Sequence, residues 1–159
     1  MVKIISVRQP WAWLIVAGHK DIENRTWRTS YRGRLLIHAS LATEPEDFPM
    51  QRQWIETCGL VIPEDLPRGA IVGAATLTDV HDWASPPYTG SVPGQVKYSP
   101  SPWFEGPYGL EMEDAVEFAE PIPWRGQLGI REASDANLTG DLFESLEDGI
   151  RFNEYLLTK

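Results

Sequence analysis

A chain of 159 residues, 42% hydrophobic and 23% charged, is long enough to bury a core and short enough to form one domain. Its single cysteine, Cys58, excludes an intrachain disulfide, and with no N-terminal signal pattern we expect a cytoplasmic protein. No apolar run approaches membrane-spanning length, so no membrane association is expected. Three histidines without close pairing give no metal signature, and we expect neither a metal nor another cofactor.

The net charge of −9 is unevenly divided along the chain. Residues 1–40 contain seven basic and two acidic side chains, a net charge of +5, whereas the remainder carries −14. A protein that coats duplex DNA needs a broad basic face, which this acidic body lacks. The basic N-terminal part favours local binding of a phosphate, a short single strand or a nucleotide, with scattered solvated charges as the alternative.

The first elements are a strand and a buried helix. Residues 2–7 are rich in β-branched side chains and predict a strand. Residues 10–17 predict a short helix, because Pro10 suits the first turn and Gly18 suits the position just after the end. The helix is apolar nearly all round, with Trp11 on one face, so it is expected to be buried in the opening of a sheet or barrel.

An extended segment over residues 20–28 follows. Alternation places Glu23 and Arg25 on one face, where they can form an ion pair. A half-buried pair would aim the remaining guanidinium donors at a ligand, although a purely structural pair is the alternative. Lys20 lies at the C-terminal rim of the helix, where the helix dipole favours a cation.

Three further polar side chains lie near these elements. Arg8 and Gln9 fall in the loop before the helix, where such side chains can contact base edges or phosphates. His38 ends an apolar strand over residues 34–40, a setting typical of a hydrogen-bonded core histidine.

The middle of the chain predicts a polar helix, then a buried strand. The helix spans residues 45–58 and carries one buried stripe, formed by Phe48, Ile55 and Cys58 with Gln51 and Trp54 beside them. Residues 70–80 are small and β-branched, which predicts a strand buried on both faces.

Residues 84–108 contain six of the 13 prolines, five aromatic residues and only two charged ones. Regular structure is therefore not expected, and the aromatic content favours a loop that folds over a site rather than a linker. A plain surface loop is the alternative. Trp103 and Tyr108 are candidates for covering a stacked base.

The last part of the chain predicts strands followed by an acidic helix. Strand pattern resumes over residues 108–130, and apolar residues at helical spacing follow over 142–150, although Gly149 argues against one continuous helix. The order of elements predicts an α+β fold with a small, mixed or antiparallel β-barrel. We expect a single domain over residues 1–159, in which residues 131–159 form an acidic helical extension.

Residues 5–40, ISVRQPWAWLIVAGHKDIENRTWRTSYRGRLLIHAS, closely resemble the opening of ASCH domains, which belong to the PUA-like superfamily. The family signature Gly-x-Lys-x-x-Glu-x-Arg is matched by Gly18, Lys20, Glu23 and Arg25. The resemblance extends over roughly residues 3–130. It implies a small PUA-like barrel with a helix across one opening and an adjacent cleft lined by the signature residues. It also implies a link to RNA.

The function expected first is binding of RNA or a nucleotide in that cleft. The expected ligand-binding residues are Arg8, Gln9, Trp11, Lys20, Glu23, Arg25, Trp103 and Tyr108. A protein-interaction domain that uses its acidic C-terminal helix is a further possibility.

The alternative is a metal-independent hydrolase that uses the same cleft through Lys20, Glu23 and His38. An ASCH-like branch of amidohydrolases acts on acylated cytidine with a Lys-x-x-Thr arrangement, but Glu23 stands here in place of the threonine nucleophile. RNA cleavage needs no such nucleophile, because the 2′-hydroxyl of RNA can attack if a base, an acid and a cation are present.

Overall fold

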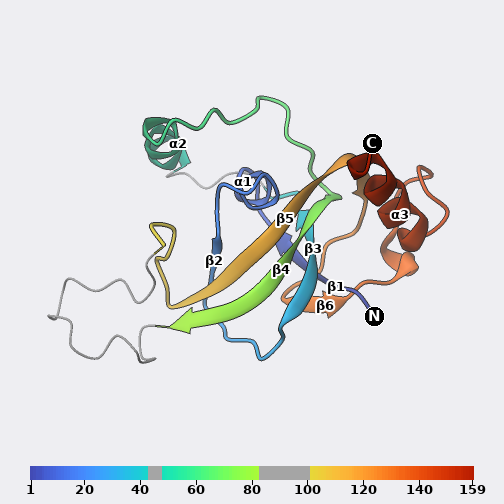
Figure 1. Ribbon diagram of the computed structural model, residues 1–159, viewed down its shortest axis with the longest axis horizontal. Helices are drawn as coiled ribbons and strands as arrows, with labels where there is room; N and C mark the ends of the chain where they lie inside the picture. The colour runs from blue at the N-terminus through green and yellow to red at the C-terminus, as the bar shows by residue number, and fades with distance from the viewer. Residues whose placement is uncertain (43–47, 83–100) are drawn as a thin grey trace, which may run out of the picture.

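Six strands form one mixed, curled sheet in the order β2-β5-β4-β3-β1-β6 (Figure 1). The structure, a computed structural model, describes residues 1–42, 48–82 and 101–159. Its elements in chain order are β1 (Lys3–Val7), α1 (Trp11–Val16), β2 (Ile22–Arg25), β3 (Gly33–Ala39), α2 (Phe48–Thr57), β4 (Ala70–Asp82), β5 (Tyr108–Pro123), β6 (Ile130–Glu132), a 3-10 turn (Asp135–Asn137) and α3 (Leu146–Leu157). The predicted α+β class and mixed sheet are therefore confirmed.

The curl of the sheet comes mainly from its two longest strands, β4 and β5. They pair antiparallel with three register shifts, and such bulges bend strands and increase their twist. β1 pairs parallel with β3 and antiparallel with β6. β2 pairs only with β5 within the sheet, so it forms one edge, and β6 forms the other. β6 thus places the first residues of the predicted C-terminal extension in the sheet itself.

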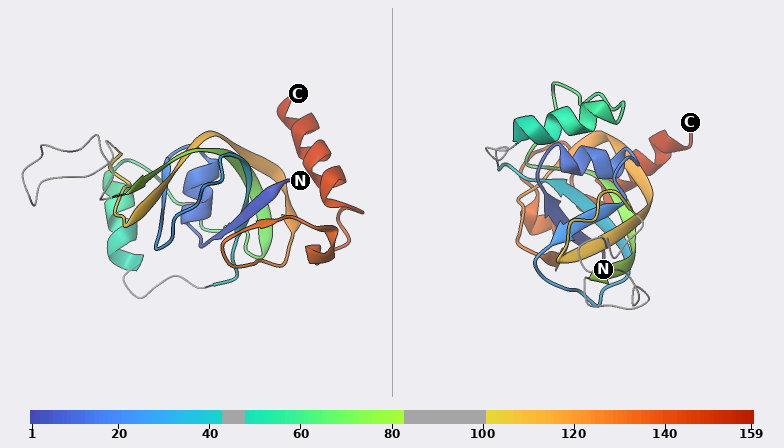
Figure 2. Two further views of the ribbon diagram at one scale, coloured as in Figure 1. Left: turned by 90° about the horizontal axis from the view of Figure 1, so that it is seen from below. Right: turned by 90° about the vertical axis from the view of Figure 1, so that its left-hand side faces the viewer.

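Helix α1 lies within the curve of the sheet, as its all-round apolar sequence predicted (Figure 2). Its residues Ala12, Leu14, Ile15 and Val16 are all buried. The helix comes so close to β4 that a Cβ atom added at Gly73 would lie 2.7 Å from Cγ1 of Val16. The small size of this glycine therefore lets the sheet close around α1.

Helices α2 and α3 lie at opposite ends of the molecule (Figures 1 and 2). In α2, the predicted stripe is correct for Phe48 and Ile55, which are buried, and wrong for Cys58, which is exposed. The helix ends at Thr57, so Cys58 already belongs to the following turn. Residues 45–47 of the predicted helix lie outside the described residues.

Helix α3 begins later than its apolar spacing predicted. Ser145 caps it by accepting a hydrogen bond from the Asp148 N–H at 3.1 Å, so Leu142 and Phe143 precede the helix. Gly149 lies inside the helix, contrary to the expected interruption. A Cβ atom there would lie 2.7 Å from Cδ1 of Ile122 on β5, so the glycine permits close packing of α3 on the sheet.

We expect Gly73→Ala to lower the free energy of unfolding by about 1–3 kcal/mol. The added methyl group would lie 2.2 Å from the Val116 carbonyl oxygen as well as against Val16, and backbone cannot move aside cheaply. Urea denaturation measures the change. Glu117→Ala, an exposed position opposite Gly73 on β5, is the control and should change stability by less than about 0.5 kcal/mol. Equal losses in both variants would contradict the close approach of α1 to β4.

Candidate functional site

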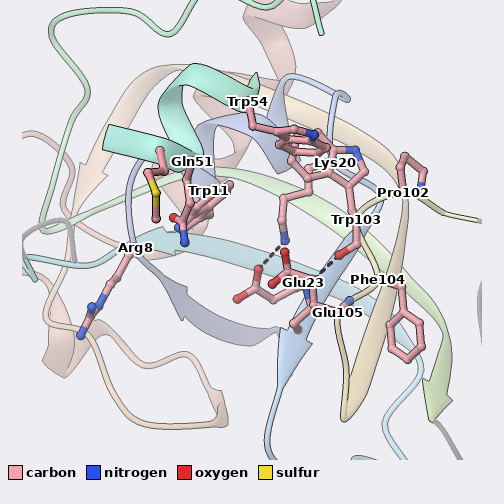
Figure 3. Close-up of a pocket in the computed structure, with 12 residues that line it drawn as sticks. Arg8, Trp11, Lys20, Glu23, Gln51, Trp54, Pro102, Trp103, Phe104 and Glu105 are labelled. Atoms are coloured by element: carbon pink, nitrogen blue, oxygen red, sulfur yellow. Dashed lines mark hydrogen bonds and ion pairs between the residues drawn. The ribbon is translucent and has the colours of Figure 1, made fainter. Parts of the chain in front are cut away.

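A cavity of about 820 Å³ opens between α1, β2, α2 and the segment that precedes β5 (Figure 3). This volume is typical of sites for small-molecule ligands. Its lining residues are Arg8, Trp11, Lys20, Glu23, Asn24, Met50, Gln51, Trp54, Pro102, Trp103, Phe104 and Glu105.

A buried ion pair lies in the middle of this cavity. Lys20 is 5% exposed and Glu23 9% exposed, and the Lys20 Nζ lies 2.8 Å from Oε2 of Glu23. The ammonium group also donates a hydrogen bond to the carbonyl oxygen of Ile22. Burying a charged group is costly unless it is paired and hydrogen-bonded, and these contacts meet that condition for Lys20.

The end of α1 sets the position of Lys20. Gly18 adopts a φ of +81°, a left-handed conformation that glycine takes readily and that commonly ends helices. The N–H groups of His19 and Lys20 then both donate to the Leu14 carbonyl oxygen, each at 2.9 Å. The turn is thereby fixed, and Lys20 enters the cavity instead of extending into solvent.

The ion pair between Glu23 and Arg25, predicted from strand alternation, is confirmed. Nη2 of Arg25 lies 3.1 Å from Oε1 of Glu23 and donates to the Ser6 carbonyl oxygen at 2.6 Å. Its guanidinium group also lies 5.7 Å from the centre of the Trp27 ring. One carboxylate thus binds two cations, which leaves the group of three residues with a net charge of +1.

The structure brings together five of the sequence-predicted site residues: Arg8, Trp11, Lys20, Glu23 and Trp103 line the cavity. Arg25 supports Glu23 but is not itself a lining residue. Tyr108 begins β5 opposite Arg25 and packs against the main hydrophobic core.

Gln9 also lies outside the lining, and its contacts are structural. Its Oε1 accepts a hydrogen bond from the Trp13 N–H at 2.9 Å, and its Nε2 donates to the Pro67 carbonyl oxygen at 3.0 Å. The side chain therefore satisfies a backbone donor in the first turn of α1 and ties the helix to the segment before β4.

Trp54 of α2 and Trp103 form an aromatic wall, of which the sequence predicted only Trp103 as a site residue. The two rings meet edge to face, with centroids 4.8 Å apart. Trp54 was expected beside the buried stripe of its helix, but its side chain is exposed and lines the cavity. Asn24, Gln51, Met50, Pro102 and Glu105 are lining residues that were not predicted as site residues.

Only the last part of the predicted loop over residues 84–108 is described. Residues 84–100 lie outside the described residues, whereas residues 102–105 all line the cavity. Phe104 is buried, with its ring against Gly109 and near His81.

His38 is a buried, hydrogen-bonded histidine and is not a lining residue. Its Nε2 lies 3.1 Å from the Trp124 carbonyl oxygen, which can only accept, so Nε2 carries the proton. Nδ1 then accepts from the Ser6 hydroxyl at 2.9 Å. Burial lowers the pKa of His38, and the hydrogen bond to Trp124 opposes this only in part.

Within the described residues, no three His, Cys, Asp or Glu side chains gather closely enough to hold a metal ion. None of the helices there combines the length and apolar composition needed to cross a bilayer.

The lowered pKa of His38 predicts a loss of stability in acid. The unfolded chain binds the proton near pH 6.5 and the folded chain only at lower pH, so the free energy of unfolding falls as the pH drops below about 6.5. The contribution of one proton reaches at most about 1.4 kcal/mol per pH unit. Urea denaturation between pH 7.5 and 5.5 should show this slope, and His38→Gln should reduce it.

The matched control is His19→Gln, because His19 is exposed at the end of α1. This variant should keep the wild-type slope. An unchanged slope in His38→Gln would contradict the assignment of the acid sensitivity to His38.

Comparison with known proteins supports the resemblance to ASCH domains. The family model described as the ASCH domain matches residues 5–114. Activating signal cointegrator 1 of Homo sapiens is 35% identical over 79 residues, which make up 47% of this chain and 14% of that protein. The same protein of Mus musculus is 34% identical over the same length, and the chain again spans only 14% of it. Because the family model covers more than half of the chain, the chain belongs to the ASCH domain family.

Proposed function

We propose that this ASCH domain binds RNA or a nucleotide in the cavity of α1, β2 and α2. One observation carries the proposal: a buried Lys20–Glu23 pair, braced from outside the lining by Arg25, lies beside a wall of tryptophan side chains in a cavity of ligand size. Phosphate and a planar base are the two parts of a nucleotide, and these two surfaces are complementary to them.

The charged side chains that line the cavity are two cations, Arg8 and Lys20, and two carboxylates, Glu23 and Glu105, so an anion would bind through the two cations. An ammonium group has three N–H donors, and the contacts of Lys20 with Glu23 and Ile22 use two of them. Arg8 is exposed at the cavity rim, on the other side of the Lys20–Glu23 pair from Trp54 and Trp103 (Figure 3). A guanidinium group binds phosphate oxygens in bidentate fashion, so Arg8 is the side chain best placed to hold a phosphate.

The aromatic surface is arranged for a base. Trp11, Trp54 and Trp103 all line the cavity, and each is a large flat surface. Stacking of one base on an aromatic side chain contributes about 1–3 kcal/mol to single-strand binding. Glu23 can accept hydrogen bonds from a base amine, because its carboxylate oxygens have lone pairs beyond those used by Lys20 and Arg25.

The cavity holds few phosphates, which limits the salt dependence of binding. Single-stranded nucleic acids lose affinity with a slope of about −0.7 per phosphate contacted in a plot of log affinity against log salt. Contacts of Arg8 and Lys20 with two phosphates therefore predict a slope of about −1.4. A coating protein on duplex DNA would show a much steeper slope.

We expect Arg8→Gln to weaken binding of a short single-stranded RNA about fivefold and to flatten the salt slope. The variant should fold normally, because Arg8 is exposed. Quenching of tryptophan fluorescence during titration measures the affinity. Arg131→Gln on β6, at the opposite edge of the sheet from β2, is the control and should bind as the wild type does. Salt-independent affinity, or equal loss in both variants, would argue against the cavity as the binding site.

A second candidate function, metal-independent hydrolysis, rests on the same Lys20–Glu23 pair. Glu23 would act as base toward a 2′-hydroxyl or a water molecule, and Lys20 would stabilise the developing negative charge. His38 contacts Ser6 and Trp124, outside the lining, so this version of the reaction does not use it.

Incubation with short RNAs and with acylated cytidine, in the presence of a chelator, separates the two functions. Binding without product supports the binding role. Product that forms in the wild type and is lost in Glu23→Gln, with folding retained, would favour the hydrolase.

A further inference from the structure

We infer that Asn24 is a positioning residue: it holds the aromatic wall of the cavity in place, and ligand affinity depends on it through Trp103. The inference rests on the proposed function, because it concerns binding in the same cavity. Asn24 lies between Glu23 and Arg25 in β2, at one of the variable positions of the family signature.

The amide of Asn24 makes three hydrogen bonds to one short segment. Its Nδ2 donates to the carbonyl oxygen of Trp103 at 2.8 Å. Its Oδ1 accepts from the N–H groups of Glu105 at 2.9 Å and Gly106 at 3.1 Å. This segment precedes β5 and forms no strand, so the side chain of Asn24 supplies the partners that a neighbouring strand would otherwise provide.

Two further contacts fasten the same segment on either side of Trp103. The Ser101 hydroxyl donates to Oδ1 of Asp21, the residue directly before β2. Phe104 is buried so closely against β5 that a Cβ atom at Gly109 would lie 2.5 Å from its ring. The segment that carries Trp103 is therefore ordered without a ligand, and Asn24 binds its backbone at residues 103, 105 and 106.

The hydrogen bond from Asn24 to the Trp103 carbonyl oxygen restrains the backbone of Trp103, whose ring lines the cavity. The direction of the Trp103 side chain depends on the Trp103 backbone, whose N–H donates to the Ser101 hydroxyl oxygen at 3.2 Å and whose carbonyl accepts from Asn24. The Trp103 ring in turn meets Trp54 edge to face, with centroids 4.8 Å apart, which links the segment to α2. Without the Asn24 amide, the Trp103 carbonyl would lose its hydrogen bond, and a stacked base would have to order the Trp103 ring on binding.

A double-mutant cycle tests whether Asn24 acts through Trp103. The ligand is a six-nucleotide single-stranded RNA of mixed sequence, and affinity is measured by titration calorimetry, which does not depend on tryptophan emission. Asn24→Ala and Trp103→Ala should each weaken binding about tenfold, in the range of one lost base stack. The double variant should also be weakened about tenfold, since two residues that act as a unit are not additive.

Two more variants distinguish the loss of the Asn24 hydrogen bond from general unfolding. Asn24→Asp keeps oxygens that accept from Glu105 and Gly106 but loses the donor to the Trp103 carbonyl, so it should weaken binding without unfolding the segment. Asn137→Ala is the matched control, because Asn137 also bonds a backbone carbonyl, that of Arg125, at 2.8 Å, but does not line the cavity. Its affinity should equal that of the wild type.

The possible results separate the inference from the proposed function. If the wild type binds the RNA and the double variant is weakened about a hundredfold, the two residues act independently and the inference is overturned. Unchanged affinity in both Asn24 variants, or in Trp103→Ala, overturns it as well. If the wild type binds neither RNA nor nucleotides, the proposed function is wrong, and the inference about Asn24 is overturned as well.

Discussion

The rest of the site depends on the two ion pairs that the Glu23 carboxylate makes, one with Lys20 and one with Arg25. Lys20 reaches it from the end of α1, and Arg25 reaches it from two residues further along β2. Without Glu23, Lys20 would be a buried cation with no counter-charge, held by the Ile22 carbonyl and by the Trp11 ring at 6.0 Å, a costly arrangement. The carboxylate therefore fixes where the helix end and the edge strand meet.

This arrangement is better explained by binding than by stability. Buried ion pairs are often no more stabilising than apolar residues of similar volume, because desolvation offsets the attraction. Here a third charge, Arg25, binds the same carboxylate from outside the lining, and the Lys20–Glu23 pair is held on a concave, aromatic surface. A preorganised charge of this kind requires little rearrangement when an anion binds, and reduced ordering is a main source of affinity.

The sequence predicted those features that depend on local chemistry. Gly18 ends α1 because of its left-handed backbone, and the Glu23–Arg25 pair follows from strand alternation. The predicted PUA-like barrel fold with a buried N-terminal helix is also confirmed. A helix that is apolar nearly all round is stable only when it is buried, and α1 is buried against the sheet.

Features that depend on tertiary approach were missed. Trp54 faces the cavity only because α2 comes near Trp103, which lies 49 positions later in the chain. Gly149 looked like an interruption of a helix, yet it serves contact between α3 and Ile122. Asn24 carried no signal at all, because its partners are backbone groups of a segment about 80 residues away. These misses share one cause: each concerns a contact between segments distant in sequence. The charged pair of the cavity, Lys20 and Glu23, comes from adjacent segments, the end of α1 and β2, so the sequence could predict it. The aromatic wall is held by Asn24 of the same strand, through contacts with a distant segment that only the folded structure creates.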